Sequence, residues 1–538
     1  MYVCFAFFPV VLALILMTRF KVSPGIAMPI SCGAAVLTGL FVWKMPLALA
    51  GAAVFLGIEK SLDIILIVTG AILLLNVLKK SGAIETINST FVSISPDTRI
   101  QAVIIAWMFS NFIEGASGFG AAPVLAAPIL VSLGVPAAAA VSVALICNTL
   151  AVPFGAVGTP ALTMSALLSP AVEKMGIEPV VFDKLLMSVF TDVSVCYGIF
   201  LPFTAVAFMI LASDDKQKMK SICEIFPFCV FAALAYLIPW KYSAEQFGPE
   251  LPSMLGSVVG LPVVLAVLKL KVPYIVPETV WNVFKKEDCQ NTDVIRQPLP
   301  MSLGKAWLPY LMIALLLVVT RMPVLPIKAI LLVVKIRIPD VFGVPGSGAT
   351  LTLLNNPGVF PCSVIALAGM FFYGLSQKDV FSVFSASFRQ LKMASIAIAM
   401  SFAMVQIMIF SDANPVGIPG MLRAAADAFA GLFGTVYVYV ALLLGTLGTF
   451  FAGSCTVSNI LFGQLQFGTA QQLGLAEHIV CALQAVGGGL GSMIRISGVV
   501  AACATVNAIG QEGRIILKNL IPAAIMAVVI FVIVFLLY

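Results

Sequence analysis

One carboxylate stands among glycines inside a hydrophobic stretch, and it is here that the sequence could do chemistry. The segment Asn111–Ala122, NFIEGASGFGAA, carries Glu114 followed by Gly115, Gly118 and Gly120. A carboxylate at the centre of a membrane helix costs about 2.5–3.5 kcal/mol, and each glycine lowers helical stability by about 1 kcal/mol. Broken backbone at membrane depth persists only where protein or a water-filled cavity supplies its hydrogen-bond partners. We therefore predict a binding site at this break, near the midplane of a bilayer.

Small hydroxyl and amide side chains accompany this break and three others further along the chain. The candidate substrate-binding residues are Ser117, Asn148, Thr149, Thr159, Ser454, Thr456, Ser458, Asn459, Ser492 and Arg495, and the glycines expected to break the helices are Gly115, Gly118, Gly120, Gly453 and Gly491. Half-helix N-termini leave backbone N–H groups unpaired and present a positive dipole end. Such ends suit a carboxylate, and Arg495 adds a cation that can donate two parallel hydrogen bonds to it.

Two acids inside hydrophobic segments, Glu114 and Asp192, are the candidate proton-coupling residues, because intramembrane ionisable residues mark functional sites by default. Structural roles stay open beside these. Glu114 could be satisfied by backbone amides, and Asp192 could form a hydrogen bond between helices. Arg495 could pair with Glu114 or extend to the membrane interface, and the glycines could serve only the close approach of helices.

The composition is that of an integral membrane protein. Of the 538 residues, 61% are hydrophobic and 10% are charged, against about 25% charged in a soluble domain, and the mean hydropathy is +1.09. There is one histidine, His478, and no CxxC motif, so we expect no metal, no cofactor and no Ser-His-Asp chemistry. The charge of +6 comes without a basic tract and predicts no nucleic-acid partner.

Apolar runs of about 20 residues recur along the chain, which is the length that crosses a bilayer as a helix. We predict an all-α polytopic protein with about 11–14 membrane segments, and Tyr2–Thr18 as a retained first helix. One long segment, Pro46–Val77, is expected to break near Glu59–Asp63. The other expected spans or half-spans are Pro24–Trp43, Ile100 into the first break, Pro123–Leu133, Ala137–Val152, Leu186–Ala212, Ile222–Trp240, Leu251–Leu268, Ala306–Val319, Cys362–Leu375, Ser395–Phe410, Val436–Phe451 and Ile516–Tyr538.

The chain also repeats itself. A shift of 338 residues places Phe112 on Phe450 and Gly115 on Gly453 without a gap. Interrupted hydrophobic segments at corresponding places in two halves indicate the site of a transporter built from repeats, which we expect to be inverted. The expected organisation is a first half at 1–270 with breaks at 111–122 and 148–160, a cytoplasmic loop at 271–305, and a second half at 306–538 with breaks at 449–466 and 484–497.

Loop lysines and arginines predict the orientation, because cytoplasmic loops are enriched in them. Asp214–Lys220 and Lys269–Lys305 are basic, whereas the intervening Lys241–Glu250 and the preceding Val172–Lys184 are not. The two basic loops are therefore expected in the cytoplasm, and the N-terminus outside.

Four motifs resemble those of the lactate permease family of proton-coupled 2-hydroxy-monocarboxylate symporters: FIEGASGFGAAP (Phe112–Pro123), NTLAVPFGAVGTP (Asn148–Pro160), GSCTVSNILFGQLQ (Gly453–Gln466) with TAQQLGL (Thr469–Leu475), and GGGLGSMI (Gly487–Ile494). The family implies inverted repeats with re-entrant hairpins. Two residues depart from its pattern: Cys455 stands where an acid is usual, and Ser492 where a lysine is usual, with Arg495 three residues further on.

The resemblance implies uptake of L-lactate, D-lactate or glycolate with a proton by a multi-pass protein of a prokaryotic cell membrane. Its expected partners are the small anion, the proton and the bilayer, and a homodimer is left open. Transport of another organic anion, or coupling to Na⁺, stays open because unwound carbonyls and hydroxyls could bind Na⁺. A membrane-embedded enzyme is the remote alternative, since the chain has no clustered nucleophile, base and metal ligands.

Overall fold

The protein is described here from a computed structural model that covers residues 2–20, 22–92, 94–118, 120–284, 301–321, 325–344 and 348–538. Within these ranges, 12 helices or tandem helices are long and apolar enough to cross a membrane. This confirms the predicted all-helical polytopic fold and falls within the predicted number of segments. One small antiparallel hairpin was not anticipated: β1 (Lys335–Ile338) pairs with β2 (Ala349–Thr352), with Lys335 opposite Thr352.

The helices of the first 270 residues surround the first two breaks. They are α1 (Tyr2–Thr18), α2 (Pro24–Phe41), α3 (Leu47–Lys80), α4 (Ala83–Val92), α5 (Thr98–Ala102), the π-helix η1 (Val103–Phe109), α6 (Ser110–Ser117), α7 (Ala121–Ser132), α8 (Ala137–Asn148), the short η2 (Val152–Phe154), α9 (Gly155–Lys174), α10 (Pro179–Gly198), α11 (Leu201–Leu211), α12 (Lys218–Phe247) and α13 (Pro252–Leu270).

The remaining helices follow the loop after α13, whose residues 285–300 lie outside the described ranges. They are α14 (Leu303–Arg321), α15 (Ile327–Leu331), the π-helical η5 (Gly358–Ser363), α16 (Val364–Phe372), α17 (Gln377–Phe410), α18 (Met421–Phe433), η6 (Gly434–Val436), α19 (Tyr437–Ala452), α20 (Cys455–Leu473), α21 (Glu477–Gly491), α22 (Ile496–Thr505) and α23 (Glu512–Leu537).

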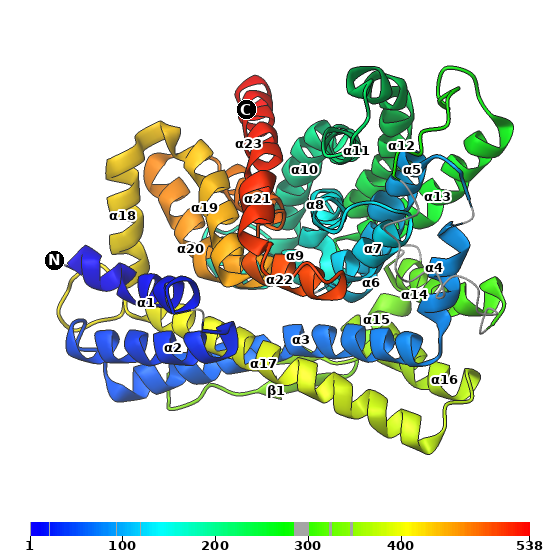
Figure 1. Ribbon diagram of the computed structural model, residues 1–538. Coiled ribbons are helices and arrows are strands. Elements are labelled where there is room, and N and C mark those ends of the chain that lie inside the picture. Colours follow the sequence, from blue (N-terminus) through cyan, green and yellow to red (C-terminus); the bar gives the residue numbers. More distant parts are fainter. Residues whose placement is uncertain are drawn as a thin grey trace.

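Long helices form one layer of the molecule. In Figure 1, α2, α3 and α17 run side by side along the lower edge, with the broken helices above them. The layer is tight because glycines let backbones meet: a Cβ on Gly57 would lie 2.4 Å from the Cα of Ala403, and one on Gly70 would lie 2.0 Å from the carbonyl oxygen of Gly358. Such approach is the usual role of small residues in membrane helix packing.

Three predicted boundaries were wrong. Helix α3 is continuous through Glu59–Asp63, and the Asp63 carbonyl is instead contacted from outside by Asn356 Nδ2 at 2.8 Å. The single span expected at Leu186–Ala212 is two helices in tandem, α10 and α11, because Pro202 lacks the N–H needed to continue α10 and suits the first turn of α11. Helix α17 begins at Gln377 rather than Ser395, with Ser376 as its N-cap.

The two broken regions share one order of elements: helix, break, helix, turn, helix, break, helix. The series is α6, α7, α8 and α9 in the first region and α19, α20, α21 and α22 in the second. The leading helices end at Ser117 and Ala452, 335 residues apart, and the next begin at Ala121 and Cys455, 334 apart. The ungapped shift of 338 was therefore wrong by three to four residues. The structure matches Gly118 to Gly453, both helix C-caps with positive φ.

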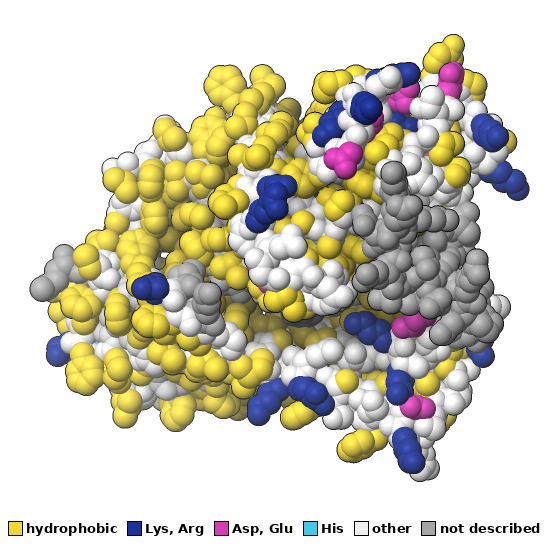
Figure 2. All heavy atoms as spheres, in the orientation of Figure 1, with side chains coloured by type: hydrophobic (Ala, Val, Ile, Leu, Met, Phe, Trp, Pro, Cys, Tyr) yellow, Lys and Arg dark blue, Asp and Glu magenta, His cyan; other side chains and the backbone are white. Residues whose placement is uncertain are grey.

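The outer surface is largely apolar. Figure 2 shows hydrophobic side chains over most of the face in view, with charged groups gathered toward the upper right and the lower edge. Exposed large side chains such as Phe41, Leu211 and Phe535 contribute to this surface. An exterior of this kind suits a protein whose sides face lipid.

Candidate functional site

A small cavity lies where the broken helices of the two regions meet. It offers about 70 Å³ of room for water-sized molecules, and one water needs about 10–15 Å³ by this measure. Its wall combines charged, hydroxyl and thiol groups with bare backbone. The lining residues are Glu114, Val152, Gly155, Ala156, Thr159, Pro160, Gly453, Ser454, Cys455, Thr456 and Arg495.

Helix N-termini converge on this cavity. The first residues of α9 and α20 line it, Arg495 is the N-cap of α22, and Gly120, which touches Arg495, is the N-cap of α7. In α20 the Ser454 hydroxyl accepts from the amide of Val457 at 3.5 Å, which leaves the first amides of the helix without an intrahelical partner. Each N-terminus carries a partial positive charge, so the cavity favours an anion.

The start of α9 is held in an unusual backbone conformation. Ala156, Val157 and Gly158 all have positive φ, at 46°, 55° and 78°, a region that costs roughly 1–2 kcal/mol for each residue with a Cβ. Asn459 of α20 donates to the Pro160 carbonyl at 3.1 Å and so ties the second region to this turn. Strain of this kind persists only where the surroundings enforce it, and it clusters at functional sites.

Glu114 is buried, with 2% of its surface exposed, at the end of α6. The Asn148 side chain and the backbone amides of Gly120 and Ala122 lie within hydrogen-bonding range of its carboxyl group. A Cβ on Gly155 would come within 3.1 Å of Oε1, so the turn before α9 packs directly on the carboxyl. Glu114 therefore sits at the N-terminal end of α7 and faces the cavity.

Arg495 is also buried, with 4% exposed, and its guanidinium is incompletely paired. Its Nε and Nη2 atoms have no hydrogen-bond partner among the described residues. No ion pair within 4.0 Å joins it to Glu114 there, although the two groups interact electrostatically. Two glycines leave room for it: a Cβ on Gly120 would lie 2.5 Å from Nη2, and one on Gly498 would lie 2.5 Å from Nε.

A family model described as L-lactate permease matches residues 3–538. The chain belongs to the L-lactate permease family. The glycolate permease GlcA of Escherichia coli (strain K12) is 28% identical over 546 residues, covering 95% of this chain and 91% of that protein. The L-lactate permease of the same strain is 28% identical over 530 residues, covering 94% and 90%. The chain is accordingly a multi-pass transport protein of the plasma membrane.

Among solved structures, the YdaH transporter of Alcanivorax borkumensis aligns with 88% of this chain and 85% of its own, at 13% identity and a TM-score of 0.42. A likeness of this size carries no weight for mechanism. The permease site is therefore argued from its own residues.

Not all the residues singled out in the permease sequence reach the cavity. Glu114, Thr159, Gly453, Ser454, Thr456 and Arg495 line it, and Asn148, Gly118 and Gly120 adjoin these. The hydroxyls of Ser117, Thr149 and Ser458 donate to carbonyls of Ile113, Leu145 and Gly445. Gly115 and Gly491 serve helix packing against Ser253 and Thr446, and Ser492 is buried without a partner.

Asp192 lies elsewhere. It forms an ion pair with Lys241, which also contacts Glu245, between α10 and α12. About a third of each of these side chains is exposed. The structure therefore does not bring this candidate proton carrier to the cavity.

Some supporting residues were missed from sequence. Asn519 of α23 donates to the Met493 carbonyl at 2.8 Å and so fixes the turn that carries Arg495. Gln466 donates to Gln484, which contacts Ser458, in a buried chain behind α20. The signal was present for Asn519, a lone amide in an apolar span. Its partner is a backbone carbonyl 26 residues away, which no local pattern reveals.

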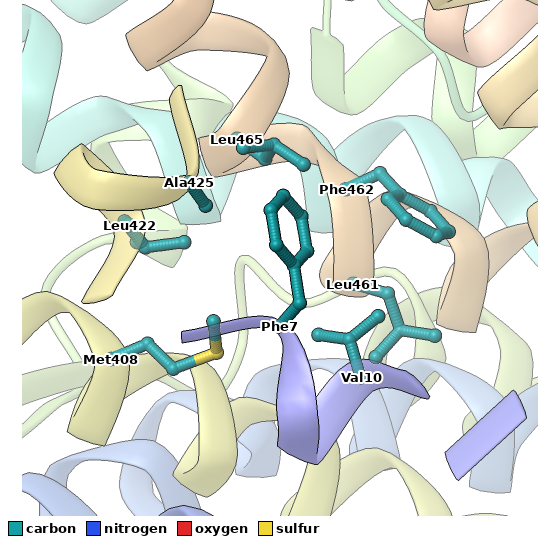
Figure 3. Close-up of a pocket in the computed structure, with 8 residues that line it drawn as sticks. All are labelled: Phe7, Val10, Met408, Leu422, Ala425, Leu461, Phe462 and Leu465. Atoms are coloured by element: carbon teal, nitrogen blue, oxygen red, sulfur yellow. The ribbon is translucent and has the colours of Figure 1, made fainter. Parts of the chain in front are cut away.

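A second pocket is unrelated to this chemistry. Figure 3 shows Phe7 pointing into an apolar space between α1, α17, α18 and α20. It has room for about one water, at roughly 10 Å³. No polar side chain lines it, so it offers nothing to orient a ligand. Its residues are Phe7, Val10, Met408, Leu422, Ala425, Leu461, Phe462 and Leu465.

Proposed function

We propose that this permease imports a small 2-hydroxy monocarboxylate, L-lactate or glycolate, together with a proton. The observation that carries the proposal is the buried, half-paired guanidinium of Arg495 facing a cavity that also contains Glu114. The names of the relatives, L-lactate permease and glycolate permease, agree with this substrate class.

The unpaired atoms of Arg495 are the ones that a carboxylate needs. Nε and Nη2 lie on the same edge of the planar guanidinium, so their N–H bonds can point in parallel at the two oxygens of one carboxylate. A buried charged donor without a partner is expensive, so a bound anion would repay that cost. The missing Cβ atoms of Gly120 and Gly498 leave this edge uncovered.

The opposite wall supplies partners for a hydroxyl group. Thr456, in the first turn of α20, makes no side-chain hydrogen bond with the described residues, and it lines the cavity together with the amide-bearing turn at Ser454. The cavity has room for about five waters, close to the bulk of lactate, which has about six non-hydrogen atoms. A 2-hydroxy acid could thus place its carboxylate on Arg495 and its hydroxyl at Thr456.

Charge balance explains why a proton would accompany the anion. Arg495 is the one cation among the residues that line the cavity. If Glu114 stayed ionised while a carboxylate entered, two negative charges would share one positive charge away from water, and buried charge without compensation costs several kcal/mol. Protonation of Glu114 removes that excess. Proton and anion would therefore stabilise the same loaded state, which is the requirement for symport.

The test is uptake of labelled L-lactate into proteoliposomes with an imposed pH gradient. We expect accumulation that follows the gradient, and exchange of internal for external lactate without one. Glu114→Gln, which resembles the protonated acid, should keep exchange and lose gradient-driven accumulation.

Three results would contradict the proposal. Uptake that ignores the pH gradient removes proton coupling, and accumulation driven only by a Na⁺ gradient favours the alternative ion. Gradient-driven accumulation that survives Glu114→Gln excludes Glu114 as the proton carrier.

A further inference from the structure

A group of buried polar atoms without partners lies beside Glu114, on helices that do not carry the substrate cavity. Trp107, Asn111, Tyr236 and Ser253 are at most 1% exposed. The indole N–H, both amide atoms and both hydroxyl oxygens of these residues make no hydrogen bond. More than about 90% of buried polar groups in proteins are paired, so five unpaired atoms in one place need an explanation. We call these four residues the buried polar cluster.

Contacts between the helices bring the four side chains together. The rings of Trp107 and Tyr236 meet edge to face with centroids 5.1 Å apart. The Tyr236 hydroxyl lies near the Ser253 hydroxyl, yet neither oxygen has a direct partner. Gly115 packs on Ser253, because a Cβ there would lie 2.8 Å from the Ser253 Cβ.

Asn111 completes the group by its position on the helix. Ser257 of α13 donates to the Met108 carbonyl at 2.8 Å, and Ser253, one turn earlier in α13, touches Gly115. Met108, Asn111 and Gly115 are three and four residues apart and so share a face. Asn111 therefore faces α13 between these two contacts.

The π-helix η1 marks the same place. It runs directly into α6, and all seven of its residues are buried. Its wider turn disturbs the regular hydrogen-bond ladder, and segments of this kind recur at functional sites. Helices η1, α6, α12 and α13 lie together on the right of Figure 1.

Glu114 stands between the buried polar cluster and the cavity. Asn111 is three residues before it, one helical turn away. None of the four cluster residues lines the cavity, whose wall on the other side of Glu114 is formed by α9, α20 and Arg495. The charged or titratable groups that act on Glu114 are Arg495 and, across the cavity, Cys455.

We propose that the buried polar cluster binds ordered water and conducts protons to and from Glu114 by a route separate from that of the substrate. Buried waters typically make about three hydrogen bonds to otherwise unsatisfied polar groups, and the cluster offers donors and acceptors of both kinds. A water next to Glu114 gives a proton to the carboxylate and receives one from the next water. Charge is conserved along the row, and no group other than Glu114 changes its protonation state.

A separate route suits the order of events in the proposed symport, on which this inference rests. A bound carboxylate on Arg495 fills the small cavity and closes that approach to Glu114. A proton path along η1 and α6 would stay usable while the cavity is occupied. Helix 98–117 starts at Asp97, in the part of the molecule where we predict the cytoplasm, so the cluster would serve proton release to that side.

The experiment compares two rates in proteoliposomes for wild type, Tyr236→Phe, Ser253→Ala and Asn111→Leu. Lactate exchange needs no net proton movement, whereas pH-driven net uptake does. We expect net uptake and the accompanying proton flux, read with a trapped pH dye, to fall about tenfold while exchange stays within about twofold. Matched controls are Tyr437→Phe and Ser31→Ala, which remove buried, unpaired hydroxyls on α19 and α2 and should change neither rate.

Each other outcome has one meaning. If the wild type moves no protons with lactate, the proposed function itself fails. If the wild type is coupled and all three variants keep its net rate, the proton route is wrong. If exchange and net uptake fall together in Tyr236→Phe, the mildest change, the cluster supports structure only and the inference is overturned.

Discussion

Arg495 and Gly120 compete for the same few ångströms at the wall of the cavity. The guanidinium reaches its position only because residue 120 has no Cβ and adopts a φ of +80°. The same backbone turn presents its amides to Glu114. One glycine thus positions both charged groups, although it carries no functional group of its own.

Replacing Gly120 by alanine tests this directly. A methyl group there would meet Nη2 at 2.5 Å and displace the guanidinium, and a misplacement of about 1 Å at a reacting centre can cost about 100-fold. We expect lactate exchange to fall by about that factor. Gly176→Ala is the matched control, because Gly176 also has positive φ, at +75°, with nothing within 4 Å of the new methyl. Equal losses in both variants would point to backbone strain rather than to Arg495.

Arg495→Lys separates charge from geometry. Lysine keeps the positive charge but cannot donate two parallel hydrogen bonds from one plane. A hydrogen bond to a charged group contributes about 1.5–3 kcal/mol, so we expect the KM for lactate to rise about 10- to 100-fold. Arg495→Gln, which loses the charge as well, should abolish measurable uptake. An unchanged KM in the lysine variant would remove the guanidinium from carboxylate recognition.

At this scale the sequence was informative about chemistry and poor about partners. Glu114 and Arg495 were recognisable because charge in a hydrophobic segment is costly and therefore retained for a reason. An ion pair between them was one open alternative, and no such pair forms within 4.0 Å among the described residues. The roles of Gly498 and Asn519 depend on atoms brought close by folding, so spacing alone could not show them.

Among the elements, the segment after α13 is fastened to the helix that leads to Glu114. Arg99, fully buried, donates to Asp97 at 2.8 Å and to the carbonyls of Ser221 and Thr279 at 2.9 Å each. Asp97 in turn accepts from the Trp281 amide at 3.1 Å. This network joins the starts of α5 and α12 to the chain beyond α13, and it fixes the end of helix 98–117 opposite to Glu114.

An acid in the neighbouring loop makes this fastening sensitive to pH. The Ser221 hydroxyl first, then the Gln217 amide and the Trp281 indole, hold the pKa of Asp215 below its ordinary value. Its contribution to stability is therefore complete above the ordinary aspartate pKa of about 3.9. That contribution disappears as the pH falls through the lower folded value.

Acid titration in detergent should reveal this contribution. We expect Trp281 fluorescence in the wild type to change only below about pH 4, and Asp215→Asn to remove that transition. Trp281→Phe identifies the signal. A transition that persists unchanged in Asp215→Asn would assign it to another group.

Helix existence was easier to predict than helix continuity. Long apolar runs gave α1, α2 and α23 nearly to the residue, because hydrophobic length alone decides them. The continuity of α3 through two acids depends on packing with α17 and on the Asn356 contact. The repeat was found at a register wrong by three to four residues, because abundant glycines allowed several alignments, whereas helix ends allow one.

For the whole molecule, the orientation in the membrane stays a prediction from loop charge. We expect Lys216→Cys, in the loop before α12, to react with a membrane-impermeant maleimide only from the cytoplasmic side. Glu178→Cys, in the loop before α10, should react only from outside. Both residues are exposed, and the background would carry serine at the exposed Cys4 and Cys223 and at Cys289. Labelling of both positions from the same side would contradict the predicted topology.

The size of the cavity limits what this permease can carry. Replacing the methyl group of lactate by a phenyl ring nearly doubles the number of non-hydrogen atoms, and about 70 Å³ cannot enclose the result. The carboxylate of such an acid could still reach the guanidinium while its ring stopped the surrounding helices from shutting. Bulky hydroxy acids should therefore act as plugs, competing with cargo without crossing, and they would trap the protein in a single conformation suited to crystallisation.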